Sequence, residues 1–175
     1  MVKCFIVVTG GMGMEVMLKN LSSVSGHGRF DETAGYIQHG GTSCMRHTVA
    51  VAYYSYMLAK KLGINCNKDE LIRGALLHDY FLYDWHEKGA GEGLHGFTHA
   101  RTALRNASRD FPLTDTEKNI IKRHMFPLTP IPPSTVEGWI VCLVDKVCST
   151  YEVFAAKPYE KLIKTLRENH VGIQC

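Results

Sequence analysis

Several histidines and two aspartates lie within, or at the ends of, segments whose apolar residues follow a helical repeat. These residues are His47, His78, Asp79, His99, His124 and Asp145. Burial of an unpaired carboxylate costs several kcal/mol, whereas imidazole and carboxylate groups that converge on a divalent cation satisfy one another. Helical bundles hold metals in this way, with ligands from facing helices. The pattern therefore predicts a helical protein with a metal centre in its interior.

Apolar residues recur at helical spacing along most of the chain from Arg46 onward, and no run alternates long enough to require a strand. The expected helices span about 46–62, 67–79, 99–107, 114–124, 134–154 and 157–168. The glycine-rich first 45 residues should add one or two short helices, with a turn at Gly10–Gly13. The predicted fold class is all-α, a bundle of about six to eight helices.

Local signals predict where several of these helices begin and end. Asn67 can cap the second helix, and Thr114 with Glu117 forms the pattern of a capping box. Gly63 supplies a stop for the first long helix. The prolines between Met125 and Pro133 require a rigid, non-helical connection.

The length of 175 residues predicts one domain with a substantial core. We divide the chain into an N-terminal extension (1–45) packed on a main domain (46–169), and a short tail (170–175). The 45% of hydrophobic and 21% of charged residues are typical of soluble globular proteins. The N-terminal apolar run Phe5–Val8 is too short for a signal peptide or a membrane span, so we expect a cytoplasmic protein without a membrane partner.

The charge balance does not favour a nucleic-acid-binding protein, and the cysteine pattern does not favour a disulfide-rich one. A formal charge of +3, from 20 basic and 17 acidic residues, does not favour stable nucleic-acid binding. A small anionic substrate remains compatible with it. The six cysteines form no Cys-x-x-Cys pair and are interpreted as reduced thiols. The sequence leaves the oligomeric state open, a homodimer included.

Three short motifs, in this order, are similar to one family. They are Arg46-His47-Thr48, Leu77-His78-Asp79-Tyr80 and Val144-Asp145-Lys146. Together they resemble the HD superfamily of metal-dependent phosphohydrolases, and in particular its small bacterial members, over roughly residues 40 to 155. The resemblance implies an HD-type helical bundle in which His47, His78, Asp79 and Asp145 hold a metal.

Many HD proteins bind two metals through two further histidines, and the resemblance assigns these roles to His99 and His124. His95 is the alternative to His99, because Leu94-His95-Gly96 also looks like a variant of that motif. We expect one or two divalent ions, with two favoured. The ligand types suit iron, manganese, zinc, nickel and cobalt alike.

The resemblance also implies a reaction, in which Asp79 bridges the metals and positions a water that attacks phosphorus. Basic residues near the ligands would then bind the phosphate, and Lys146 and Arg101 are the first candidates ahead of Arg46, Arg105 and Arg123. The expected enzyme is a hydrolase, a phosphomonoesterase or phosphodiesterase acting on a nucleotide or another small phosphate ester.

Two other functions are compatible with the same residues. Some dinuclear iron HD proteins are oxygenases, and a chain that binds a metal or nucleotide without turnover would be a sensor. Tyr80, Tyr83 and Trp85 follow the His-Asp pair and fit either the core or a stack on a nucleobase. The sequence alone does not choose between these readings.

Overall fold

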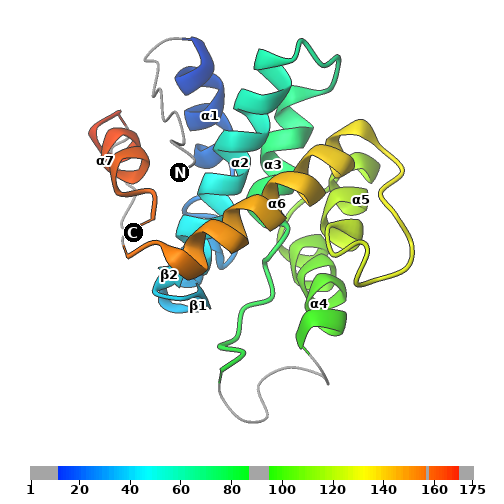
Figure 1. The fold of residues 1–175 in the computed structure, drawn as a ribbon. Helices are drawn as coiled ribbons and strands as arrows, with labels where there is room; N and C mark the ends of the chain where they lie inside the picture. Colours follow the sequence, from blue (N-terminus) through cyan, green and yellow to red (C-terminus); the bar gives the residue numbers. More distant parts are fainter. Residues whose placement is uncertain (1–11, 87–94, 157, 170–175) are drawn as a thin grey trace.

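The computed structural model describes residues 12–86, 95–156 and 158–169, and these form the predicted all-α fold (Figure 1). The helices are α1 (Met12–Ser22), the 3-10 helix η1 (Phe30–Gly35), α2 (Cys44–Lys61), α3 (Lys68–Leu77), α4 (His95–Asp110), α5 (Asp115–Arg123), α6 (Val136–Phe154) and α7 (Glu160–Asn169). Among the described residues, no helix has the combination of length and hydrophobicity that crossing a membrane requires.

The predicted helix boundaries are confirmed where a cap defines them. The Asn67 side chain accepts hydrogen bonds from the first turn of α3, and Thr114 and Glu117 form both hydrogen bonds of a capping box on α5. After α2, Gly63 has a φ of 63°, which a glycine adopts without strain. The amides of Gly63 and Ile64 donate to the carbonyls of Lys60 and Ala59, which is the Schellman arrangement.

A short hairpin precedes α2, although the sequence reading expected no strand there. β1 (Ile37–His39) pairs antiparallel with β2 (Thr42–Ser43), and Gly40 and Gly41 form the turn. Gly40 has a φ of 57°, and two-residue turns of this kind favour glycine. Both strands are too short for alternating apolar and polar residues to produce a recognisable strand pattern in the sequence.

Two helices begin earlier than the sequence indicated. α4 starts at His95 rather than near His99, because its first turn carries the exposed Phe97 and a glycine instead of apolar core positions. The turn expected at Gly10–Gly13 is wrong at its end, since Gly13 belongs to α1. A Cβ at Gly13 would lie 3.0 Å from the Tyr56 ring, so glycine lets α1 approach α2 closely. Residues 10 and 11 lie outside the described part of the chain.

The core is built around α2, which packs against α3 and α6. α3 also packs against α5, and α5 contacts both α4 and α6. In Figure 1, α6 runs across the front of α2 and α3. α1 packs on α2 and α3, and η1 packs on α2. The division into an extension, a main domain and a tail stays a prediction.

Candidate metal centre

The ends of three helices, the second turn of another and the middle of a fifth converge on one buried cluster. His47 lies in the first turn of α2, His78 caps the end of α3 and Asp79 follows directly. His124 caps the end of α5, and Asp145 lies midway along α6. The second turn of α4 contributes one more side chain, that of His99. All six predicted ligands are buried, with exposures of 0–6%.

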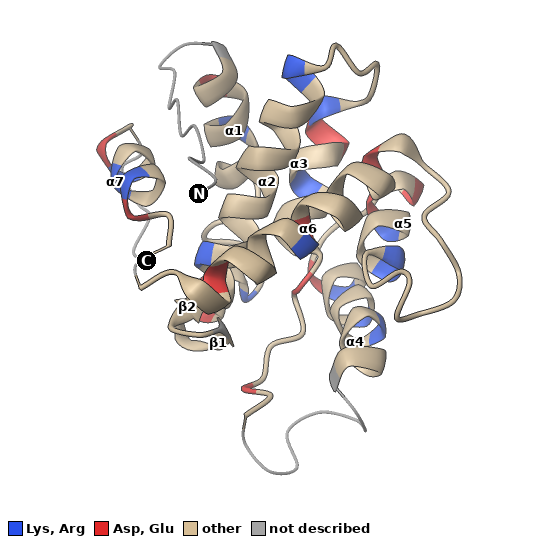
Figure 2. Ribbon diagram, viewed as in Figure 1, with Lys and Arg blue, Asp and Glu red and all other residues tan. Residues whose placement is uncertain are grey.

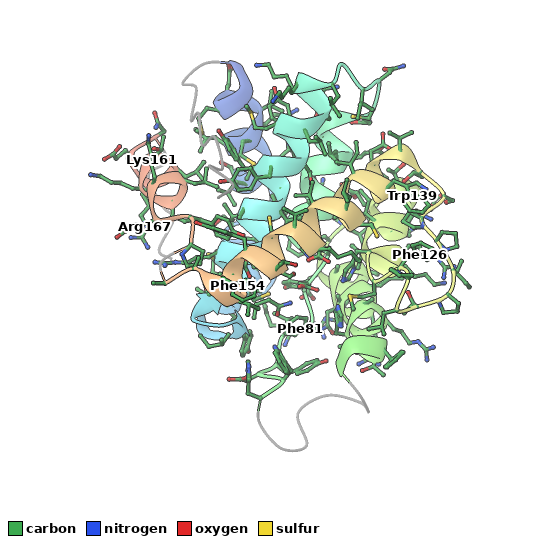
Figure 3. All side chains as sticks on the ribbon, viewed as in Figure 1. Phe81, Phe126, Trp139, Phe154, Lys161 and Arg167 are labelled. Atoms are coloured by element: carbon green, nitrogen blue, oxygen red, sulfur yellow. The ribbon has the colours of Figure 1, made fainter. Side chains whose placement is uncertain are left out.

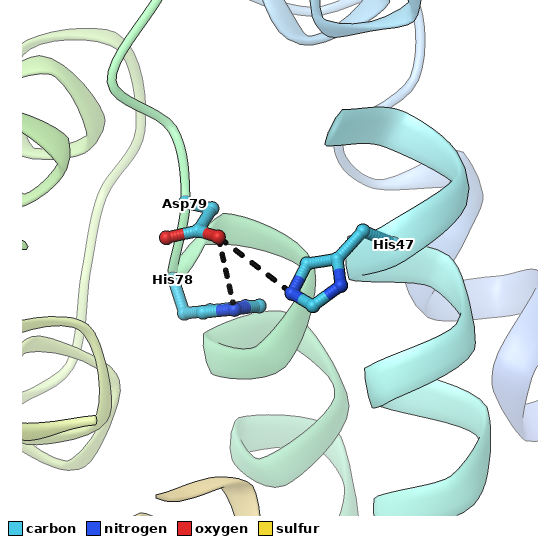
Figure 4. Close-up of side chains that lie close together, drawn as sticks. All are labelled: His47, His78 and Asp79. Carbon is cyan, nitrogen blue, oxygen red and sulfur yellow. Dashed lines mark ion pairs between the residues drawn. The ribbon is translucent and has the colours of Figure 1, made fainter. Parts of the chain in front are cut away.

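The carboxylate of Asp79 lies at the centre of this cluster and faces a different pair of histidines with each oxygen. Its Oδ2 is 3.4 Å from Nε2 of His78 and 3.6 Å from Nε2 of His47 (Figure 4). Its Oδ1 is 3.3 Å from Nε2 of His99 and 3.4 Å from Nε2 of His124. Asp79 therefore joins two groups of nitrogen atoms, one on each side.

Asp145 completes the group around His47 and His78. Its Oδ1 lies 3.1 Å from Nε2 of His47 and 3.7 Å from Nε2 of His78. The two groups also touch each other, since the rings of His78 and His124 have centroids 4.8 Å apart and these two residues could share a metal with Asp145. The cluster is continuous, and metal ligation by its six members stays a prediction.

The backbone fixes the orientation of two of these imidazoles. Nδ1 of His78 is 2.7 Å from the carbonyl oxygen of Ala75, and Nδ1 of His124 is 2.9 Å from that of Ile121. A carbonyl oxygen only accepts, so Nδ1 carries a proton in each ring and Nε2 is the nitrogen that faces the cluster. Each histidine reaches the free carbonyl three residues earlier because it caps its helix.

Two polar residues that the sequence analysis did not predict form hydrogen bonds with members of the cluster. Glu152 is 1% exposed, and its carboxylate oxygens lie 2.9 and 3.1 Å from Nδ1 of His47. Gln38, from β1, donates a short hydrogen bond from Nε2 to Oδ2 of Asp79. Glu152 follows Asp145 by seven residues, two helical turns, and that spacing could have revealed it. No sequence signal marks Gln38, because its hairpin was not recognised.

The electrostatics keep both aspartates ionised. Burial by itself raises the pKa of Asp79, but the charge of His78 and the contacts with His124 and His99 hold it well below its usual range. Burial is likewise outweighed at Asp145 by His47 and His78, so the pKa of Asp145 is also low. Ionised carboxylates are the form that binds a cation.

The histidines respond in opposite directions. Burial lowers the pKa of His124, which favours the neutral imidazole that ligates metals. Burial also acts to lower the pKa of His47, but its hydrogen bonds with Asp145 and Glu152 raise it to about 10. A metal ligates only the neutral imidazole, so a metal at this histidine would displace the proton that the two carboxylates favour there.

Two buried atoms at the centre of the cluster test whether its residues fit a cation. Nε2 of His78 and Oδ1 of Asp79 have no hydrogen-bond partner within the part of the chain that the structure describes. A buried polar atom without a partner is costly, and a cation between these atoms and their neighbours would satisfy both. The donor set of imidazole nitrogens and carboxylate oxygens fits divalent transition metals. The residues present thus fit the predicted metal.

A cavity of about 680 Å³ opens onto the cluster. Its lining includes Asp79, His99, His124 and Asp145 of the cluster together with Lys146. The Lys146 ammonium donates to the His124 carbonyl oxygen at 2.6 Å and lies 3.8 Å from Oδ2 of Asp145. The structure therefore brings Lys146 to the candidate site, as the sequence analysis expected of a phosphate-binding residue.

Arg101, the other basic residue chosen from the sequence, is not brought there. It is exposed and lines a separate hollow together with Lys122 and Arg123. The physical reason is the face of α4 it occupies: Arg101 lies two residues beyond His99, and residues two apart on a helix point in different directions. The side chain of His95, the alternative ligand, lies outside the described part of the chain.

The three aromatic residues that the sequence analysis weighed as base-stacking candidates also lie in different places. Tyr80 is 1% exposed and its hydroxyl donates to Asp110, so it belongs to the core. Tyr83 lines a separate hollow, together with Arg29 and Arg105. Trp85 lines the cavity over the cluster and is the aromatic residue of the three that could contact a substrate.

Comparisons with known proteins give one match. A family model described as the HD domain matches residues 45–150, which is more than half of the chain. Neither the curated proteins nor the solved structures contain a match. The matched range includes all six residues of the buried cluster and ends two residues before Glu152.

Proposed function

The chain belongs to the HD-domain family, and on this premise we propose that it is a metal-dependent phosphohydrolase acting on a nucleotide or another small phosphate ester. The observation that carries the proposal is the carboxylate of Asp79, whose two oxygens face two different pairs of buried histidines. Such an arrangement suits a bridge between two cations, which clamp a phosphoryl group in many phosphatases.

Two divalent ions would be held by different residues. One would take His47, His78, Asp145 and Oδ2 of Asp79, and the other would take His99, His124 and Oδ1 of Asp79. Bound there, the cations supply Lewis-acid chemistry: they lower the pKa of water and offset negative charge on phosphoryl oxygens. Both sets of donor atoms are buried, so solvent would screen their attraction for the cations less than at the protein surface.

The chain itself supplies the remaining groups for a phosphate ester. Lys146 places an ammonium at the cavity wall, where it would bind and orient an anionic phosphoryl group. The part of the wall formed by Trp85, Met125, Pro127 and Leu128 is largely apolar and would hold the rest of the substrate. A volume of about 680 Å³ is in the range for a small-molecule site, which supports a nucleotide-sized ligand.

The proposal is tested by phosphate release from a panel of nucleoside monophosphates, dinucleotides and simple phosphate esters, with the protein loaded with manganese, iron(II) or zinc. We expect turnover by the loaded wild-type protein, none after chelation, and none in Asp79→Asn. Asp84→Asn is the matched control, because Asp84 lies in the loop after the cluster and accepts from His86 instead. It should keep full activity.

Other outcomes would contradict the proposal in specific ways. Hydrolysis that survives in Asp79→Asn would remove the bridging carboxylate from the mechanism. Oxygen consumption by the iron-loaded protein without phosphate release would identify an oxygenase. Tight metal or nucleotide binding without any turnover would identify a sensor.

A further inference from the structure

α6 carries a row of exposed apolar side chains on the side away from Asp145. We call this row the outer stripe, and its members are Val136, Trp139, Leu143, Val147, Tyr151 and Phe154. Their exposures range from 41% to 84%. Successive members are three or four residues apart, so they follow one face of the helix. In Figure 3, Trp139 and Phe154 mark positions near the two ends of α6.

The charged residues of α6 do not interrupt the outer stripe. Asp145 and Glu152 are buried at the metal centre, and Glu137 accepts from the Asn67 amide. The ammonium of Lys146 is directed to the His124 carbonyl. Figure 2 shows the ribbon of α6 mostly in tan, with few positions coloured as charged. A continuous apolar surface without charges is typical of a protein–protein contact.

The spacing of the outer stripe is symmetric about position 145. Leu143 and Val147 are each two residues from that position, Trp139 and Tyr151 are each six, and Val136 and Phe154 are each nine. A second α6 packed antiparallel, with a twofold axis at this level, would place each residue opposite its counterpart. A twofold interface requires a surface that is complementary to itself, and the symmetric spacing of the outer stripe is compatible with that requirement.

The area of the outer stripe is sufficient for such a contact. A fully accessible aromatic side chain offers roughly 150–250 Å². With the exposures above, the stripe presents on the order of 600 Å² of apolar surface per chain, at the upper end of the roughly 300–600 Å² found for the largest patch on a monomer. Each partner in a standard interface buries about 800 Å², so flanking polar residues would need to add only a fraction.

We propose that the outer stripe is the interface of a homodimer, in which α6 packs antiparallel against α6 of a second copy of this chain. Trp139 is held in place by an edge-on contact with Phe126, with ring centroids 5.5 Å apart, and would be a preformed anchor at each end of the interface. Since Asp145 lies at the level of the axis but points inward, the two metal centres would lie back to back. The dimer does not depend on the proposed catalytic activity.

Sedimentation velocity on the full chain, at about 1 to 100 µM, tests the interface and its direction together. The wild-type protein should be a dimer. Leu143→Lys and Val147→Glu should each weaken dimerisation at least about tenfold, because each buries an unpaired charge. The double variant L143K/V147E should regain dimers, since the antiparallel arrangement puts each introduced ammonium opposite an introduced carboxylate.

Val153→Lys is the matched control. Val153 is 62% exposed on the same helix, but it lies about 100° around the axis from Phe154. It should leave the dimer intact, and circular dichroism should show unchanged helix content in every variant. A wild-type protein that is monomeric throughout the range would overturn the proposal, as would dimers that survive both single substitutions. Failure of the double variant to recover would refute the antiparallel register.

Discussion

Replacement of Glu152 by glutamine should weaken metal binding without disturbing the fold. The carboxylate accepts a hydrogen bond from Nδ1 of His47 at 2.9 Å, and this contact orients Nε2 of that ring toward Asp145. Glutamine has nearly the same shape and keeps one acceptor, but it loses the charge. A hydrogen bond to a charged acceptor is stronger than a neutral one by about 1–2 kcal/mol. The loss of an outer carboxylate behind a metal-binding histidine commonly costs 10–100-fold in affinity.

Both considerations give a loss of about 2 kcal/mol in metal-binding free energy, which corresponds to a dissociation constant roughly thirty times larger. The assay is competition between the purified protein and a chelator for zinc or cobalt at fixed pH, with circular dichroism as the check on folding. Glu137→Gln is the control on the same helix, because its carboxylate contacts the Asn67 amide and not the cluster. An affinity within twofold of wild type in Glu152→Gln would refute the assigned role of Glu152.

Three further substitutions test separate parts of the structure. A hydrogen bond from Arg109 lowers the pKa of the Asp110 carboxyl group to about 2. The stability that the ionised carboxylate contributes is therefore present above about pH 4 and is lost as the pH falls through about 2. After allowance for solvent screening, Asp110→Asn should lower the free energy of unfolding, measured with urea, by about 1 kcal/mol at pH 7 and by almost nothing at pH 2. An equal loss at both pH values would contradict the ion pair. A Cβ at Gly74 would clash with Cδ1 of Ile120 and lie 3.1 Å from its Cβ. Gly74→Ala should therefore lower the free energy of unfolding by about 1–2 kcal/mol despite the better helix propensity of alanine, and a stabilised variant would show that α3 and α5 are loosely packed. Lys146→Met should raise the KM for an anionic substrate about tenfold with a smaller change in kcat, and an unchanged KM would remove Lys146 from phosphate binding.

The sequence was most informative where one local interaction decides the structure. Asn67 and the Thr114–Glu117 pair cap their helices as predicted, because a capping side chain acts within a few residues of itself. The clustering of His78 and Asp79 with Asp145 was also foreseeable. Charged groups in apolar helices have few ways to be satisfied, and each way requires that they meet.

The sequence was least informative where the outcome depends on the packing of distant segments. Gln38 reaches Asp79 only because the β1–β2 hairpin folds beside α2, and no spacing within the chain encodes that approach. Arg101 was chosen for its proximity to His99 in sequence, but the rotation of α4 turns it toward a different hollow. Glu152 was missed although its seven-residue distance from Asp145 placed both on one face of α6.

The number of metal ions bound per chain tests the central claim most directly, since that claim is a pair of cations joined by Asp79. Equilibrium dialysis against manganese or zinc, with elemental analysis, should give two ions per chain for the wild-type protein. His124→Ala and His99→Ala should each give one, because both histidines face the same oxygen of Asp79. A single ion in the wild-type protein that both variants retain would contradict the account.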